Sequence, residues 1–301
     1  MTQPLQGSIQ RVGVVGAGAM GHGIAQVLLR YGYQVVLTDS SASFLDRGRE
    51  RIQKGLARDV EKARLTAEER DRALAALESS TSLDAAAAAD FVIEAITENF
   101  DAKAQVWRDL DARARPEVIF ASNTSSISIT RLAAVTRRAA QFVGLHFFNP
   151  VPVMKLVEVV AGLDTSPEAV DVAEKLARSL EKTPVRVNDA PGFVSNRVLM
   201  PMINEAVYAV MEGVAAPQAV DEVMKLGMNH PMGPLELADF IGLDVCHDIM
   251  QVLYEGFHDS KYRPCPLLEK MVAAGRLGRK SGRGFYDYSA AAGTKKGAGA
   301  G

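Results

Sequence analysis

The sequence predicts an α/β protein, in which a doubly wound, mostly parallel sheet is followed by a second, all-helical domain at the C-terminus. Three observations lead to this prediction. A glycine-rich turn joins an apolar run to a helical pattern near the N-terminus, strand-like and helix-like segments alternate up to about residue 188, and helical segments alone follow Pro191. Alternation of strands and helices is typical of a parallel sheet covered by helices on both faces.

The first predicted elements form a strand, a tight turn and a helix. Residues 12–15 (Val-Gly-Val-Val) are a short apolar run, and Gly16-Ala-Gly-Ala-Met-Gly21 follows directly. A GxGxxG sequence in this context indicates a dinucleotide-binding site. Gly16 permits the tight turn, Gly18 lets the backbone approach a pyrophosphate, and Gly21 lets the helix pack close to the strand. The fold is therefore expected to be of the Rossmann type.

A second strand-like run, residues 34–38, ends at Asp39, eighteen residues after Gly21. This is close to the offset of about 20 residues at which a carboxylate binds the adenine ribose hydroxyls. A carboxylate there would repel a 2′-phosphate, so the sequence favours NAD over NADP. Arg47 and Arg49, on the next predicted helix, leave NADP open as the weaker alternative.

The elements that follow are read from the same patterns. Residues 42–78 predict one or two long helices, with a capping box, Thr66 to Glu69, between them. Ser166 and Pro167 supply an N-cap and a first helical residue for a later helix. The other elements expected in this part are strands over 91–96 and 118–122, a helix over 102–114, and a loop or short helix over 85–89.

A histidine stands at the end of a further apolar strand. His146 follows residues 142–145, and an Asn-Pro-rich turn (149–152) leads to a strand-like run that carries Glu158. Imidazole is suited to proton transfer near neutral pH, and a carboxylate bonded to its second nitrogen would stabilise the imidazolium. If the turn folds the chain back, the two side chains face each other; otherwise they are a core histidine and an unrelated surface glutamate. The predicted dinucleotide site favours the first alternative.

Residues 190–289 are expected to form the helical domain, after an NAD-binding domain over 1–189. The segment 194–210 is apolar around much of its circumference, which suggests a homodimer interface or, alternatively, an ordinary domain core. Residues 290–301 lack periodicity and are predicted to be a disordered tail. The expected helices cover about 193–212, 217–226, 234–256 and 265–275.

The composition excludes several classes of protein. Acidic and basic residues nearly balance, 36 against 34, and no basic stripe suggests a nucleic-acid partner. Neither a secretory signal nor an apolar stretch suited to a membrane is visible, so a cytoplasmic protein is expected. Two cysteines make no disulfide framework and match no metal-binding spacing.

Seven motifs occur in order between about Ile9 and Tyr288, and together they resemble one family. The motifs are GAGAMG at 16–21, VIEA at 92–95, SNTSSISIT at 122–130, GLHFFNPVPVMKLVEV at 144–159, DAPGFVSNR at 189–197, NHPMGPLEL at 229–237 and GRKSGRGFYDY at 278–288. With these motifs the chain is similar to the L-3-hydroxyacyl-CoA dehydrogenases, most closely the short-chain bacterial 3-hydroxybutyryl-CoA dehydrogenases.

The resemblance implies a role for individual residues. His146 matches the catalytic base, Glu158 the acid that orients it, Ser125 the serine beside the substrate hydroxyl, and Asn196 an asparagine that helps to hold the reacting group. For coenzyme A it implies Lys62, although a serine used in some members is Gly55 here. For NAD it implies Gly16, Gly18, Met20, Gly21, Asp39, Ala95, Glu98, Lys103, Asn149 and Lys280.

The implied activity is NAD-linked interconversion of a (S)-3-hydroxyacyl-CoA and a 3-oxoacyl-CoA, with His146 as general acid and base. Two alternatives stay open on the residues alone. One is a Rossmann dehydrogenase of a sugar acid or another small hydroxy acid. The other is a non-enzymatic NAD-binding or structural relative.

Overall fold

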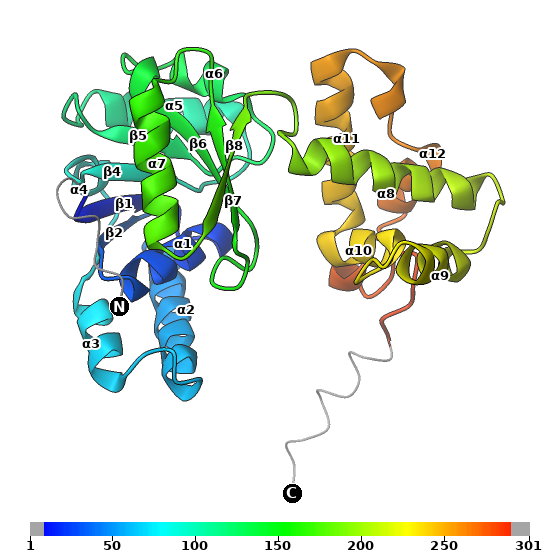
Figure 1. Ribbon diagram of the computed structural model, residues 1–301, viewed down its shortest axis with the longest axis horizontal. Coiled ribbons are helices and arrows are strands. Elements are labelled where there is room, and N and C mark those ends of the chain that lie inside the picture. Colours follow the sequence, from blue (N-terminus) through cyan, green and yellow to red (C-terminus); the bar gives the residue numbers. More distant parts are fainter. Residues whose placement is uncertain (1–8, 290–301) are drawn as a thin grey trace, which may run out of the picture. The chain divides into compact units, whose positions relative to one another are not determined.

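The computed structural model describes residues 9–289 of the chain, so the predicted tail over 290–301 lies outside the described residues. The chain divides into two compact units, Met1–Ala190 and Pro191–Gly301 (Figure 1). The first contains a sheet, and the described residues of the second form helices and connecting loops, so the predicted fold class is confirmed.

The first unit is built on an eight-stranded sheet of order β3-β2-β1-β4-β5-β6-β7-β8. Strand pairs are parallel except for β6 and β7, which are antiparallel, so β7 and β8 run opposite to the other six strands. The strands are β1 (Arg11–Val15), β2 (Gln34–Thr38), β3 (Leu77–Ser80), β4 (Phe91–Glu94), β5 (Ile119–Ser122), β6 (Phe142–Phe147), β7 (Leu156–Ala161) and β8 (Thr183–Asn188).

Helices cover both faces of this sheet. Val12 and Val14 of β1 share a buried cluster with α1, whereas Gly13, which points the other way, faces Ala86 of α4. Figure 1 shows α7 lying along the strands from β6 to β8. The helices of this unit are α1 (Ala19–Arg30), α2 (Ala42–Glu61), α3 (Ala67–Ala75), α4 (Leu83–Ala87), α5 (Phe100–Asp111), α6 (Ile129–Ala133) and α7 (Pro167–Ser179).

Two local predictions in this unit are confirmed and two are wrong. Thr66 and Glu69 form both hydrogen bonds of the capping box, and the Ser166 side chain caps α7. The strand predicted over 91–96 ends at Glu94, because the chain leaves the sheet to form the cavity described below. The helices predicted over 42–78 extend too far, because Leu77 and Glu78 belong to β3. No prediction covered β8 or the short helix α6.

The second unit contains five α-helices among its described residues, packed around a buried cluster that includes Ile203, Leu235 and Leu253. The single helix predicted over 234–256 is wrong, because Gly242, with φ of +111°, ends one helix and begins the next. The helices are α8 (Ser195–Met211), α9 (Pro217–Gly227), α10 (Pro234–Ile241), α11 (Leu243–Phe257) and α12 (Pro266–Ala273). Within residues 9–289, none of the helices has the length and apolar character needed to span a bilayer.

Candidate active site

The glycine-rich turn between β1 and α1 is closed so tightly that two of its positions admit no side chain. Gly16 has φ of +103°, and its N–H donates to the Thr38 carbonyl over 2.7 Å. A Cβ on Gly21 would lie 1.7 Å from the Gly16 carbonyl oxygen, whereas one on Gly18 would meet open space. Helix α1 begins just after Gly18, which offers no side chain to cap it, so its first N–H groups suit a phosphate.

A cavity of about 730 Å³ opens in front of this turn. Asp39 lies on its wall, and its carboxylate accepts the N–H of Ala17 over 2.9 Å and the N–H of Ser41 over 3.1 Å. These two bonds fix a negative charge at the end of β2, as required for binding ribose hydroxyls. Of the residues predicted to bind NAD, Gly16, Gly18, Met20, Asp39 and Ala95 line this cavity.

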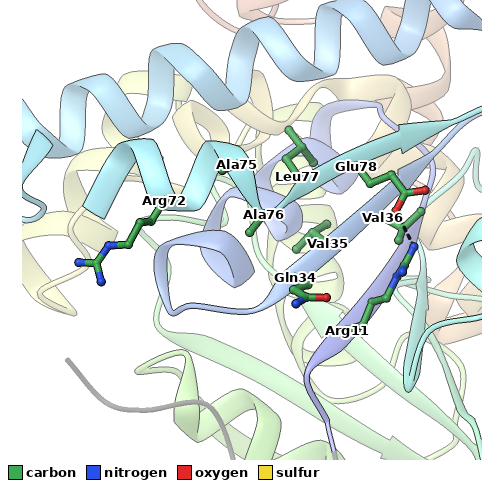
Figure 2. A pocket seen from close by; sticks show the side chains of 9 residues that line it. All are labelled: Arg11, Gln34, Val35, Val36, Arg72, Ala75, Ala76, Leu77 and Glu78. Carbon is green, nitrogen blue, oxygen red and sulfur yellow. Dashed lines mark hydrogen bonds and ion pairs between the residues drawn. The ribbon is translucent and has the colours of Figure 1, made fainter. Parts of the chain in front are cut away.

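A second cavity, of about 500 Å³, lies at the amino ends of β1, β2 and β3 (Figure 2). Its wall carries the ion pair between Arg11 and Glu78, whose side chains are 35% and 53% exposed. Ligands of doubly wound sheets bind at the carboxyl ends of the strands. The cavity in front of the glycine turn, and not this one, therefore belongs to the candidate site.

The Asn-Pro-rich turn does fold the chain back, and it brings His146 and Glu158 together. His146 on β6 and Glu158 on β7 are directly opposite in the antiparallel register, and both side chains are buried. His146 Nδ1 lies 2.8 Å from Glu158 Oε2. An ionised carboxylate can only accept a hydrogen bond, so Nδ1 carries the proton of the neutral imidazole and Nε2 is its basic nitrogen.

Ser125 lies in a turn that one carboxylate organises. Glu98 Oε1 accepts the Thr124 hydroxyl over 2.5 Å, the Ser125 N–H over 2.8 Å and the Ser125 hydroxyl over 3.3 Å. It also accepts the N–H and the hydroxyl of Ser126, each over 3.2 Å. The predicted cofactor residue Glu98 and the predicted substrate residue Ser125 are therefore joined directly by hydrogen bonds.

Lys103 forms an ion pair with this carboxylate. Its side chain is 1% exposed, and its ammonium lies 2.5 Å from Glu94 Oε1 and 3.3 Å from Glu98 Oε2. Burial raises the pKa of Glu98, but the charge of Lys103 and the bonds from Thr124 and Ser125 outweigh it and keep that pKa below its usual value. Glu98 is therefore ionised at neutral pH. Lys103 supports the turn of residues 124–126 indirectly, because its charge keeps the Glu98 carboxylate ionised.

The other predicted residues are found in separate places. Asn149 is exposed on the loop between β6 and β7, and Lys62 is exposed at the C-terminal end of α2. A Cβ on Gly55 would lie 2.2 Å from the Gln26 amide oxygen, so the serine of some relatives would require the Gln26 side chain to shift. In the second unit, Asn196 is buried in the first turn of α8, and the Lys280 ammonium lies 2.6 Å from an Asp244 carboxylate oxygen.

The sequence matches two family models in succession. Residues 11–190 match the NAD-binding domain of 3-hydroxyacyl-CoA dehydrogenase, and residues 192–288 match its C-terminal domain. The chain belongs to the 3-hydroxyacyl-CoA dehydrogenase family. It is an NAD-dependent oxidoreductase, and the glycine turn, Asp39 and the cavity between them suit that cofactor.

Individual members of the 3-hydroxyacyl-CoA dehydrogenase family are similar over nearly their whole length. The chain is 57% identical over 280 residues to the probable 3-hydroxybutyryl-CoA dehydrogenase of Bacillus subtilis, covering 93% of this chain and 98% of the relative. It is 52% identical over 283 residues to the 3-hydroxybutyryl-CoA dehydrogenase of Bradyrhizobium diazoefficiens, covering 94% and 97%. The crystal structure of the (S)-3-hydroxybutyryl-CoA dehydrogenase of Ralstonia eutropha superposes with a TM-score of 0.91 at 53% identity, covering 93% and 99%.

Three residues that support the site in this dehydrogenase were not predicted. Glu94 accepts the Ser122 hydroxyl over 2.7 Å besides pairing with Lys103, and Thr124 binds Glu98. The Asn123 side chain accepts the N–H of Phe147, the residue after His146, over 2.9 Å. The dense Ser, Asn and Thr content of residues 122–126 was the available signal, because such side chains bond to nearby backbone.

Proposed function

We propose that the protein interconverts (S)-3-hydroxybutyryl-CoA and acetoacetyl-CoA, with NAD as the hydride carrier and His146 as the general acid and base. The observation that carries the proposal is the buried His146–Glu158 pair, with Nδ1 and Oε2 2.8 Å apart. The names of the similar proteins support the four-carbon substrate, because three of them act on 3-hydroxybutyryl-CoA by name.

In the oxidative direction, His146 Nε2 removes the proton of the C3 hydroxyl group as that carbon becomes a carbonyl. Bound NAD supplies the hydride acceptor. Glu158 stabilises the imidazolium that results, because its negative carboxylate accepts the hydrogen bond from Nδ1–H. In the reductive direction, the imidazolium returns the proton to the carbonyl oxygen. Acid–base help of this kind contributes about 10²–10⁴ in rate.

Ser125 and Asn196 complete the proposal on the substrate side. Ser125 binds the oxygen on C3, and Glu98 fixes it through the turn of residues 124–126. Asn196 helps to hold the reacting group, Lys280 binds the cofactor, and Lys62 binds the coenzyme A tail.

The test is NADH oxidation by the purified protein, followed by absorbance. Acetoacetyl-CoA should be reduced rapidly, while free acetoacetate, or NADPH in place of NADH, should give little turnover. Equal rates with free acetoacetate would favour a dehydrogenase of small hydroxy acids. A folded protein that binds NADH but reduces neither compound would overturn the proposal.

We also propose that the protein is a cytoplasmic homodimer that associates through its helical unit. Cys246 and Cys265 are unbridged and buried, as is usual in a reducing compartment. The helical unit leaves apolar side chains exposed on α8, α9 and the residues that follow them: Val198, Met211, Val214, Val223, Leu226 and Met228. Light scattering should give twice the mass of one chain, and a monomer at micromolar concentration would contradict the proposal.

A further inference from the structure

Lys182, between α7 and β8, is a buried lysine that bonds to the loop between His146 and Glu158. Its ammonium donates to the Val151 carbonyl over 2.6 Å and to the Met154 carbonyl over 2.7 Å. Both carbonyls belong to the segment 149–154, which begins with Asn149. The side chain of Lys182 therefore crosses from one edge of the sheet to the loop that leaves the catalytic strand.

The same loop is held from a second side by the cofactor helix. Val151 is 2% exposed, and a Cβ on Gly23 of α1 would lie 3.1 Å from the Val151 Cβ. Within the loop, the N–H groups of Val153 and Met154 donate to the Pro150 carbonyl over 2.9 and 3.0 Å. Residues 150–154 are thus held in place both by packing against helix α1 and by hydrogen bonds from the Lys182 ammonium.

A buried ammonium is costly unless a carboxylate pairs with it. Within residues 9–289, no carboxylate forms an ion pair with Lys182. The small cavity beside it is lined by Arg30, Arg64 and Lys155, with Glu181 as the acid. Asp59 pairs with both arginines, at 3.9 Å from Arg30 and 3.5 Å from Arg64, and leaves Lys182 itself unpaired. Burial, and then Glu181, raise the pKa of the Tyr31 hydroxyl, which lines the same cavity.

The electrostatic setting is reflected in the protonation of Lys182. Burial, and then repulsion from Arg30, lower its pKa to about 8. Because the pKa of Lys182 is lowered in the folded protein, its side chain is mostly protonated below about pH 8 and loses its proton as the pH rises through that value. A neutral amine has two N–H donors and makes weaker bonds to carbonyl groups than an ammonium does.

We propose that Lys182 is a positioning residue, whose ammonium holds the loop of residues 149–154 in the conformation in which Asn149, which the family resemblance assigns to the NAD site, contacts the cofactor. The proposal rests on the proposed function, because it takes NAD, the hydride carrier named there, as the cofactor that Asn149 contacts. The geometry that supports it is the pair of short bonds to Val151 and Met154, together with the packing of Val151 on α1.

The test compares Lys182→Met with Lys155→Met, which removes an exposed positive charge from the same cavity. We expect Lys182→Met to lower kcat for acetoacetyl-CoA reduction by about 10²-fold, as small misplacements near the reacting atoms do. The Lys155→Met variant should stay within about twofold of the wild type, the range of ordinary surface substitutions. A Lys182→Met variant with wild-type kcat and KM from pH 6.5 to 9.5 would overturn the proposal.

A second variant keeps the test decisive if Lys182→Met does not fold. In the oxidative direction, where the neutral form of His146 acts as the base, kcat of the wild type should fall above about pH 8 as Lys182 loses its proton. Arg30→Gln removes the repelling charge, so the same fall should move to higher pH, and an unmoved profile would overturn the proposal. If the wild type does not reduce acetoacetyl-CoA at all, the proposed function fails instead. The pH dependence of NADH affinity, measured by fluorescence in the wild type and Arg30→Gln, then tests Lys182 by itself.

Discussion

Replacing Glu98 by glutamine should loosen the turn that carries Ser125 while leaving the cofactor turn intact. Glutamine is nearly the same size and keeps one acceptor oxygen, but it removes the negative charge. The amide nitrogen must then face either the donors of residues 124–126 or the Lys103 ammonium, which lies 3.3 Å from Glu98 Oε2. Both arrangements place a donor against a donor.

The size of the effect follows from the two shortest bonds, to the Thr124 hydroxyl at 2.5 Å and the Ser125 N–H at 2.8 Å. A bond to a charged group contributes about 1 kcal/mol more than a neutral one. Since the Glu98 side chain is 38% exposed, we count only these two bonds. The loss is then about 2 kcal/mol, or about 30-fold in kcat/KM if it all affects the positioning of Ser125.

The assay is kcat/KM for acetoacetyl-CoA together with NADH affinity, for Glu98→Gln and for a control, Glu78→Gln. Glu78 pairs with Arg11 at the surface, where such pairs contribute about 0–1 kcal/mol. Because the pKa of Glu98 is held below its usual value, the carboxylate stays ionised and the effect should be constant from pH 6 to 8. The reasoning is refuted if Glu98→Gln retains kcat/KM within twofold of the wild type.

Three further substitutions have distinct expected outcomes. Asp39→Asn should raise KM for NADH and increase the ratio of NADPH to NADH activity about tenfold or more. Parallel assays with the two cofactors would measure this ratio, and an unchanged ratio would show that Asp39 does not select the cofactor. Gly21→Ala places a Cβ 1.7 Å from the Gly16 carbonyl oxygen, so fluorescence titration should show loss of NADH binding, and normal affinity would contradict the predicted close packing. Lys103→Met leaves the fully buried Glu94 without its cation and should cost about 3–5 kcal/mol in urea unfolding; a change below 1 kcal/mol would contradict this.

The sequence predicted the elements whose patterns are strong. The glycine turn needs residues without side chains at Gly16 and Gly21, so the spacing of the glycines alone was enough to predict the turn. His146 and Glu158 could be paired because an Asn-Pro-rich turn separates two short apolar runs, and the antiparallel register then places them opposite each other.

The elements that were missed lack such a pattern. Strand β3 has the polar sequence Leu-Glu-Ser-Ser at one edge of the sheet, and β8 has a single buried residue, Val187. Their position is determined by pairing with a neighbouring strand, which periodicity alone cannot show. The link between Glu98 and Ser125 joins residues 27 positions apart, and Lys182 reaches carbonyls about 30 positions away, so only the folded chain reveals them.

The most direct test of the proposed acid–base role is the turnover of His146→Ala with acetoacetyl-CoA and NADH, measured beside its affinity for NADH. We expect kcat to fall by about 10²–10⁴-fold, while the affinity for NADH stays close to that of the wild type, because the glycine turn and Asp39 are unchanged. Turnover within a few fold of the wild type would contradict the assignment of His146 as the group that transfers the proton.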